Sequence, residues 1–97
     1  MKLVIQPEAE TDIVEAAVWY DERSPAVRRR FLQTVEAALA VIADHPQRYQ
    51  TIYRQVRRVV LRRFPYALLY VASEDEVNVI ACIHGRQSPT RWQRRIR

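Results

Sequence analysis

The sequence predicts an α+β domain in which an N-terminal helical hairpin packs on one face of a curled antiparallel sheet. Apolar residues recur with helical spacing in the first half of the chain and with a period of two in the second half. The two helical stripes need an apolar surface to cover, and the strands supply one. The expected element order is β-α-α-β-β-β. A chain of 97 residues supports one hydrophobic core, so we expect a single domain over residues 1–97.

The first half of the chain contains the signals for one short strand and two helices. We expect the strand at residues 2–6, and Pro7 marks the start of the first helix. The apolar stripe of this helix consists of Ala9, Ile13, Ala16, Ala17 and Tyr20. Ser24-Pro25 has the pattern of an N-cap followed by the first helical residue. The second stripe repeats the same spacing with Phe31, Val35, Ala38, Leu39 and Ile42, and the helix should end before residues 44–46.

The second half contains three predicted strands, at residues 56–61, 66–73 and 77–84. The last two are apolar on both faces and should be central, whereas the arginine-rich first one should be more exposed. Arg58 and Arg62 share one parity on that strand, and Arg57 and Arg63 share the other. One of these two pairs should therefore point to the sheet face that the helices leave open. By the same count, His84 shares a face with Ile80 and Cys82.

Charge is distributed unevenly along the chain. Residues 1–22 contain six acidic residues and one lysine, a net charge of −5, whereas residues 23–97 contain fifteen arginines and five acidic residues, a net charge of +10. The arginine fork binds carboxylate and phosphate groups in two-point contacts, so an acidic partner is expected. The single Cys82 cannot form an internal disulfide, and the sequence contains no apolar run of membrane-spanning length. We therefore expect a cytoplasmic protein.

His84, Arg57 and Arg86 are the candidates for catalysis. Cleavage of a phosphodiester needs a base, an acid and cations around the phosphate, and these residues could supply part of that set. The alternative role of His84 is that of a hydrogen-bonded polar residue at a strand end. Cys82, His84 and His45 are too few to predict a metal site, and no cofactor is expected.

The element order, together with residues 57–71 (RRVVLRRFPYALLYV) and 79–95 (VIACIHGRQSPTRWQRR), resembles the RelE/ParE family of bacterial type II toxin-antitoxin toxins. The matching positions extend over almost the whole chain. They are Pro7-Glu8-Ala9, Asp12-Ile13, Tyr20, Arg30-Phe31, Pro46, Arg57, Phe64-Pro65-Tyr66, His84-Gly85-Arg86 and Trp92.

This resemblance implies one of two activities. RelE-like members are ribosome-dependent mRNA endonucleases that use basic residues and commonly a tyrosine or histidine near the C-terminus. ParE-like members share the fold, lack that set, and act on DNA gyrase to block replication. Arg57 and Arg86 match basic positions of the nucleases, but no tyrosine follows Arg86, and Trp92 cannot exchange a proton usefully. The ParE-like branch is favoured, in which no catalytic residue is expected.

The resemblance also implies a partner. A small antitoxin would cover the basic surface of the toxin and so control growth inhibition and plasmid stabilization. The residues expected to bind partners are Arg57, Arg58, Arg62, Arg63, Arg86, Arg91, Trp92 and Arg94. Three functions remain open: a gyrase inhibitor, an mRNA endonuclease that uses His84, Arg57 and Arg86, and a non-toxic member that only binds an antitoxin.

Overall fold

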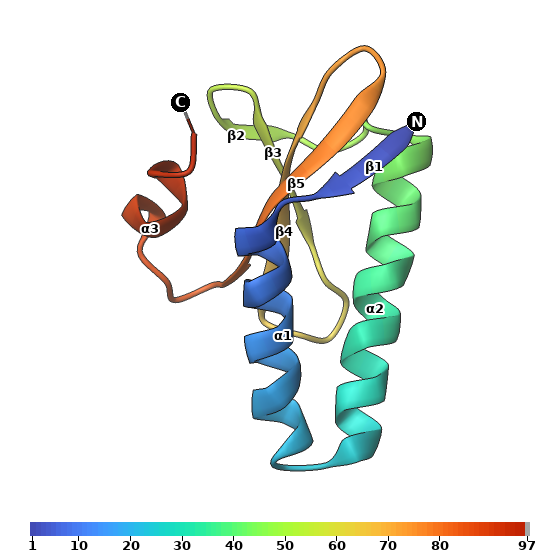
Figure 1. Ribbon diagram of the computed structural model, residues 1–97, viewed down its shortest axis with the longest axis vertical. Helices are drawn as coiled ribbons and strands as arrows, with labels where there is room; N and C mark the ends of the chain where they lie inside the picture. Colours follow the sequence, from blue (N-terminus) through green and yellow to red (C-terminus); the bar gives the residue numbers. More distant parts are fainter. Residues whose placement is uncertain (97) are drawn as a thin grey trace.

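The structure, a computed structural model, describes residues 1–96; Arg97, the last residue of the C-terminal arginine run, lies outside the described residues. Its elements are β1 (Lys2–Ile5), α1 (Pro7–Asp21), α2 (Pro25–Asp44), β2 (Thr51–Tyr53), β3 (Val56–Val60), β4 (Tyr66–Ala72), β5 (Glu76–His84) and α3 (Pro89–Gln93), as Figure 1 shows. The α+β class and the N-terminal helical hairpin are confirmed. The short strand β2 and the helix α3 are additions to the predicted order.

The five strands form one sheet in the order β1-β5-β4-β3-β2. The pairs β2–β3, β3–β4 and β4–β5 are antiparallel, as expected, whereas β1 lies parallel to β5, with Leu3 opposite Val77 and Ile5 opposite Val79. Parallel neighbours need a long connection, and here residues 6–75 provide it. The sheet is therefore mixed, with its one parallel pair at the edge.

A bulge interrupts the pairing of β4 with β5. Leu69 pairs with Ala81 and Tyr70 with Val79, so Ile80 is an extra residue in β5. The bulge shifts the alternation of side chains by one position. His84 shares a face with Cys82 but not with Ile80, which packs on the opposite side of the sheet. The predicted grouping of all three residues on one face was wrong for Ile80.

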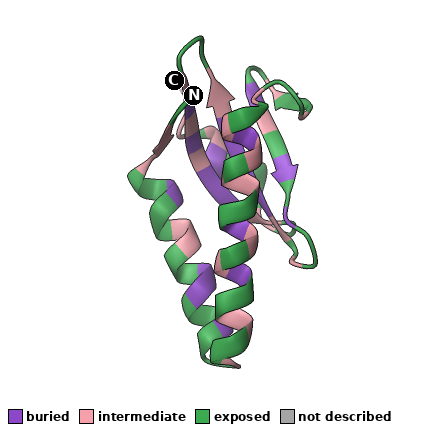
Figure 2. Cartoon of the chain, turned by 90° about the vertical axis from the view of Figure 1, so that its right-hand side faces the viewer, coloured by how far each residue is buried: buried purple, intermediate pink, exposed green. Residues whose placement is uncertain are grey.

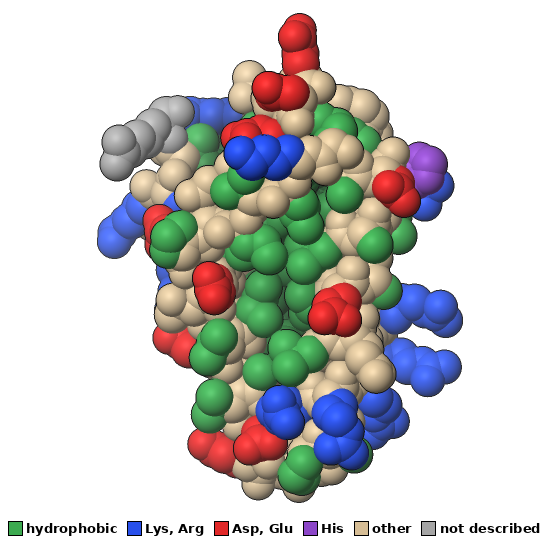
Figure 3. All heavy atoms as spheres, turned by 45° about the vertical axis from the view of Figure 1, so that its right-hand side comes forward, with side chains coloured by type: hydrophobic (Ala, Val, Ile, Leu, Met, Phe, Trp, Pro, Cys, Tyr) green, Lys and Arg blue, Asp and Glu red, His purple; other side chains and the backbone are tan. Residues whose placement is uncertain are grey.

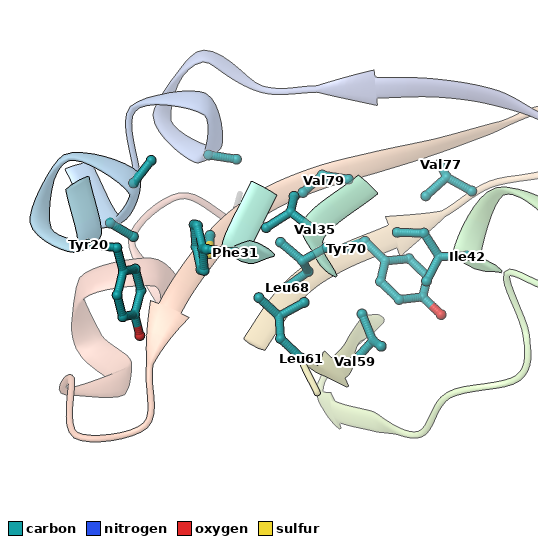
Figure 4. Close-up of a cluster of buried hydrophobic side chains, with 14 residues drawn as sticks. Tyr20, Phe31, Val35, Ile42, Val59, Leu61, Leu68, Tyr70, Val77 and Val79 are labelled. Atoms are coloured by element: carbon teal, nitrogen blue, oxygen red, sulfur yellow. The ribbon is translucent and has the colours of Figure 1, made fainter. Parts of the chain in front are cut away.

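The main core lies between the helical hairpin and one sheet face. Both predicted helical stripes face it, and the outer faces of the two helices are exposed (Figure 2). Phe31 and Ile42 of α2 lie against Leu68 and Tyr70 of β4 in this cluster (Figure 4). The hydroxyl of the fully buried Tyr70 donates a hydrogen bond to the carbonyl of Pro46 at 2.8 Å. A tyrosine in the core thus also fixes the segment that leaves α2.

The opposite sheet face is not open along its whole length, because α3 covers part of it. Trp92 of α3 is only 4% exposed and packs with Val56, Leu69 and Ala81. The Trp92 ring meets the Tyr53 ring edge to face, with 5.6 Å between the ring centroids. The C-terminal segment is therefore part of the fold. No helix of the described chain is both long and apolar enough to cross a bilayer.

Candidate functional site

His84 ends β5 and makes local hydrogen bonds. Its Nδ1 accepts the backbone N–H of Arg86 at 3.1 Å, and its own backbone N–H donates to Oε1 of Gln87 at 2.7 Å. The imidazole lies edge-on to the Tyr66 ring, with 5.2 Å between the ring centroids. These contacts fit the role of a hydrogen-bonded residue that organises the turn after the strand.

Arg57 faces the helical side of the sheet, because it lies opposite Tyr70 in the β3–β4 ladder. Its guanidinium donates hydrogen bonds to the backbone carbonyls of Tyr49 and Gln47 and to the side-chain oxygen of Gln47. These bonds tie the segment between α2 and β2 to β3. The Arg57 guanidinium is therefore already engaged in hydrogen bonds within the protein.

The three candidate catalytic residues are not assembled into one site. In the sheet register, Arg57 lies opposite Tyr70 and His84 lies opposite Tyr66, four residues apart on β4. That separation corresponds to about 13 Å along the strand. Arg86 is exposed beyond the end of β5. A base and two cations placed in this way cannot surround one phosphate in this conformation.

Three arginines line a groove beside α2, which we call the α2 groove. Arg30 comes from α2, and Arg62 and Arg63 come from the β3–β4 connection. The groove has a volume of about 650 Å³, and Tyr20 and Phe64 contribute apolar surface to it. Strand β3 ends at Val60, so strand parity does not extend to Arg62 and Arg63. The expected pairing of Arg58 with Arg62, and of Arg57 with Arg63, was therefore wrong.

A second groove, which we call the sheet groove, lies on the sheet face next to α3. Arg58, Val60 and Trp92 line it, and its volume is about 470 Å³. Val60 is 64% exposed, which is unusual for a valine in the middle strands of a sheet. Arg86, Arg91 and Arg94 are exposed on the turn and helix that follow β5. The predicted partner-binding residues thus divide between Arg57, which is engaged internally, and two separate surfaces.

Asp12 and Arg95 form a half-buried ion pair that the sequence did not reveal. The Arg95 guanidinium donates to both carboxylate oxygens of Asp12, at 2.7 and 3.2 Å, and to the carbonyl of Ile80 at 2.9 Å. The Asp12 carboxylate also accepts the backbone N–H of Cys82 at 3.0 Å. These bonds give hydrogen-bond partners to backbone groups of Ile80 and Cys82 at the edge of β5, beyond the point where β1 ends. The side-chain hydrogen bond that Arg95 donates to Asp12 is the main cause that raises the pKa of Arg95.

Cys82 lies buried on β5 under this ion pair. Burial, and to a smaller extent the charge of Asp12, raises the pKa of its thiol to about 12. A thiol of this kind stays protonated near neutral pH and is a poor nucleophile or metal ligand. Within residues 1–96, no three His, Cys, Asp or Glu side chains come together in a way that could hold a metal ion.

The fold and its surface define a small basic α+β protein that displays arginines around two grooves and has a helical hairpin on a five-stranded mixed sheet. The family model described as "ParE toxin of type II toxin-antitoxin system, parDE" matches residues 3–89. The chain therefore belongs to the ParE toxin family of type II toxin-antitoxin systems.

Individual relatives agree with this membership. Toxin ParE2 of Mycobacterium tuberculosis, in the strains CDC 1551 / Oshkosh and H37Rv, is 25% identical over 89 residues, which cover 91% of this chain and 85% of ParE2. A solved chain described as "Chromosomal ParDE TA system from P. aeruginosa" superposes with a TM-score of 0.76 at 15% identity, covering 87% of this chain and 95% of its own. The second likeness shows that the fold is shared.

Proposed function

We propose that this toxin inhibits DNA gyrase through protein contacts in the cytoplasm and thereby blocks replication. The observation that carries the proposal is the separation of Arg57, His84 and Arg86. The Arg57 guanidinium is hydrogen-bonded to Gln47 and Tyr49, and the His84 Nδ1 accepts a backbone N–H. These residues therefore do not form one catalytic site around a phosphodiester. Surface grooves lined by arginine and aromatic residues, by contrast, suit contacts with an acidic protein surface.

We further propose that a cognate antitoxin neutralises the toxin. The protein has a net charge of +5, and most of its arginines are exposed. Among residues 1–96, ion pairs with carboxylates form only at Arg28 and Arg95. An acidic partner would therefore meet guanidinium groups that form no ion pair within the described part of the toxin, which supports charge complementarity as the basis of neutralisation.

Two assays with the purified toxin test its target. We expect loss of supercoiling when DNA gyrase is incubated with the toxin, and intact mRNA when translating ribosomes are incubated with it. Cleavage of mRNA in the ribosomal A site would refute the gyrase proposal in favour of the endonuclease. Inertness in both assays, with antitoxin binding retained, would identify a non-toxic antitoxin-binding member.

The His84→Ala variant adds a test at the level of one residue. Because His84 contacts its own turn and the Tyr66 ring, we expect the variant to retain inhibition of gyrase once it is shown to be folded. Loss of toxicity in a variant with the circular dichroism spectrum of the wild type would point to a catalytic histidine instead.

A further inference from the structure

The sheet groove exposes apolar side chains next to an arginine. Val60 of β3 is 64% exposed and Ile52 of β2 is 36% exposed, and both line the groove. Arg58 alternates with Val60 along β3 and so points to the same sheet face. Trp92 borders the groove from α3. The groove therefore combines an apolar floor with a cation at its side.

The register of the sheet explains the hollow in this floor. Val60 lies opposite Ala67, and Ala67 lies opposite Ile83, so the three side chains form one row across β3, β4 and β5. Adjacent strands are about 4.8 Å apart, and roughly 10 Å therefore separates the two outer strands of the row. Between Val60 and Ile83 the row has only the methyl group of Ala67, and all three residues line the groove. This arrangement leaves room for one apolar side chain of a partner.

The segments that build the groove contain no acidic residue. Residues 45–73 and 77–97 have no Asp or Glu, and every lining residue belongs to these segments. Glu76 begins β5 and lies roughly 20 Å from Ile83 along the strand. Arg58 forms no ion pair among residues 1–96. The face on the α2 side of the molecule, by contrast, carries acidic and basic side chains together (Figure 3). The charge of the sheet groove therefore favours an acidic occupant.

The aromatic residues of the groove are engaged within the protein, which favours a protein occupant over a nucleic acid. Trp92 is only 4% exposed, and its ring contacts the Tyr53 ring. The Tyr66 ring meets the rings of Phe31 and His84 edge to face, with 5.5 and 5.2 Å between the centroids. Single-stranded nucleic acids bind largely by stacking their bases on accessible aromatic rings. An aliphatic floor beside an arginine suits instead an apolar side chain flanked by carboxylates.

We propose that the sheet groove is the surface by which the toxin contacts DNA gyrase, through an acidic segment of gyrase that carries an apolar side chain. The apolar side chain packs over Ala67 between Val60 and Ile83, and a carboxylate of the same segment pairs with Arg58. This inference rests on the proposed inhibition of gyrase, and it makes no use of the α2 groove or of the antitoxin. Inhibition should therefore depend on the sheet face opposite the helical hairpin.

Two groove variants and a matched control test the inference. Val60→Glu places a carboxylate on the floor, and Ala67→Leu fills the hollow without changing the charge. The control, Val14→Glu, makes the first substitution at a valine of α1 that is 53% exposed and lies outside both grooves. We expect both groove variants to weaken the binding of purified DNA gyrase at least about tenfold, and to weaken inhibition of supercoiling by a similar factor. Val14→Glu should change neither by more than about twofold.

Arg58→Gln separates the contribution of charge from that of shape. The affinity of the wild type for gyrase should fall as the salt concentration rises, and this decrease should be smaller for Arg58→Gln. The salt dependence of Ala67→Leu should equal that of the wild type, because this substitution changes no charge. Circular dichroism and urea denaturation establish which variants are folded. Arg58 and Val60 are exposed, so their variants decide the question even if Ala67→Leu does not fold.

The outcomes separate this inference from the proposed function. Undiminished inhibition of gyrase by all folded groove variants would overturn the inference and leave the proposed function intact, whereas a wild type that does not bind gyrase would refute the proposed function itself. Groove variants that lose affinity for the purified antitoxin but bind gyrase normally would assign the groove to the antitoxin and overturn the inference. Binding of a short single-stranded RNA by the wild type but not by Ala67→Leu would overturn it in favour of a nucleic acid.

Discussion

Arg57 illustrates, for a single residue, where a sequence pattern stops being informative. It lies beside Arg58 on a strand rich in arginine, and both were expected to bind partners. In the structure, the guanidinium of Arg57 bonds to carbonyl groups eight and ten residues earlier in the chain, whereas Arg58 lines the sheet groove. In the sequence, residue type and strand parity give the same kind of information about both residues, so they do not show which of the two will bond within the protein. The difference arises from the path of the loop after α2, which no local pattern records.

This difference between neighbours gives a stability prediction. Arg57→Ala removes hydrogen bonds from a charged donor and should lower the free energy of unfolding by about 1–2 kcal/mol, since the site is partly open to solvent. Arg58→Ala, on the exposed side of the same strand, should change it by less than about 0.5 kcal/mol. Urea denaturation of both variants measures the two values. Equal effects would show that Arg57 does not stabilise the loop.

Cys82 leads to a prediction about pH. In the folded protein its thiol has a pKa of about 12, raised from 9.0 chiefly by burial, so folding favours the protonated form. Its contribution to stability is therefore complete below pH 9 and decreases as the pH rises from about 9 to about 12. At pH 8 we expect iodoacetamide to label Cys82 rapidly in urea and very slowly in the native protein, as measured by mass spectrometry. Rapid labelling of the native protein would contradict the buried position.

At the scale of elements, the structure confirms those that have a local signature. Ser24-Pro25 marks the start of α2 as predicted, although the Ser24 side chain makes no capping hydrogen bond. The same dipeptide, Ser88-Pro89, starts α3, where the Ser88 hydroxyl accepts the N–H of Thr90. This signal was present in the sequence, but the predicted element order ended with the strand at residues 77–84 and contained no helix after it. The helix α3 could have been predicted by applying one rule consistently.

Other features of the elements had no usable signal. Strand β2 is three residues long, and the turn that follows it places an arginine, not a glycine or asparagine, in the left-handed conformation. The bulge in β5 falls at Ile80, which lies between the apolar residues Val79 and Ala81, so the hydrophobic pattern is the same with or without it. Short strands and register shifts of this kind depend on the neighbouring strand, which becomes known only when the chain has folded.

At the scale of the whole molecule, the two sides of the sheet differ in how strongly they are packed. The side under the helical hairpin contains the large cluster of Figure 4, whereas the buried residues of the cluster under α3 are, among residues 1–96, only Val56, Leu69, Ala81 and Trp92. The large cluster could be predicted because each helix carries its stripe in its own sequence. The small cluster and the grooves could not, because Trp92, Tyr53 and Val56 meet only through the tertiary fold.

This difference in packing between the two sheet faces predicts that α3 opens separately from the rest of the protein. One buried tryptophan and the Asp12–Arg95 pair hold it, so the amides of Arg94 and Arg95, which bond within this segment, should exchange by local opening. Amides at the centre of β4 should exchange only through global unfolding. Hydrogen exchange followed by NMR at a series of low denaturant concentrations distinguishes the two processes.

Two aspartate variants show whether the ion pair sets this local stability. Asp12→Ala removes the carboxylate from a pair in which Arg95 and Asp12 are only 17% and 11% exposed, and it leaves Arg95 without its charged partner. Opening at Arg94 and Arg95 should then become at least about tenfold more frequent. This change corresponds to a loss of at least about 1.4 kcal/mol of local stability. Asp21→Ala breaks a pair with Arg28 in which the side chains are 50% and 40% exposed, and it should leave this exchange unchanged. If Asp12→Ala left the exchange at Arg94 and Arg95 as slow as that of β4, α3 would have to unfold together with the sheet, and the C-terminal segment would belong to the same cooperative unit as the main core.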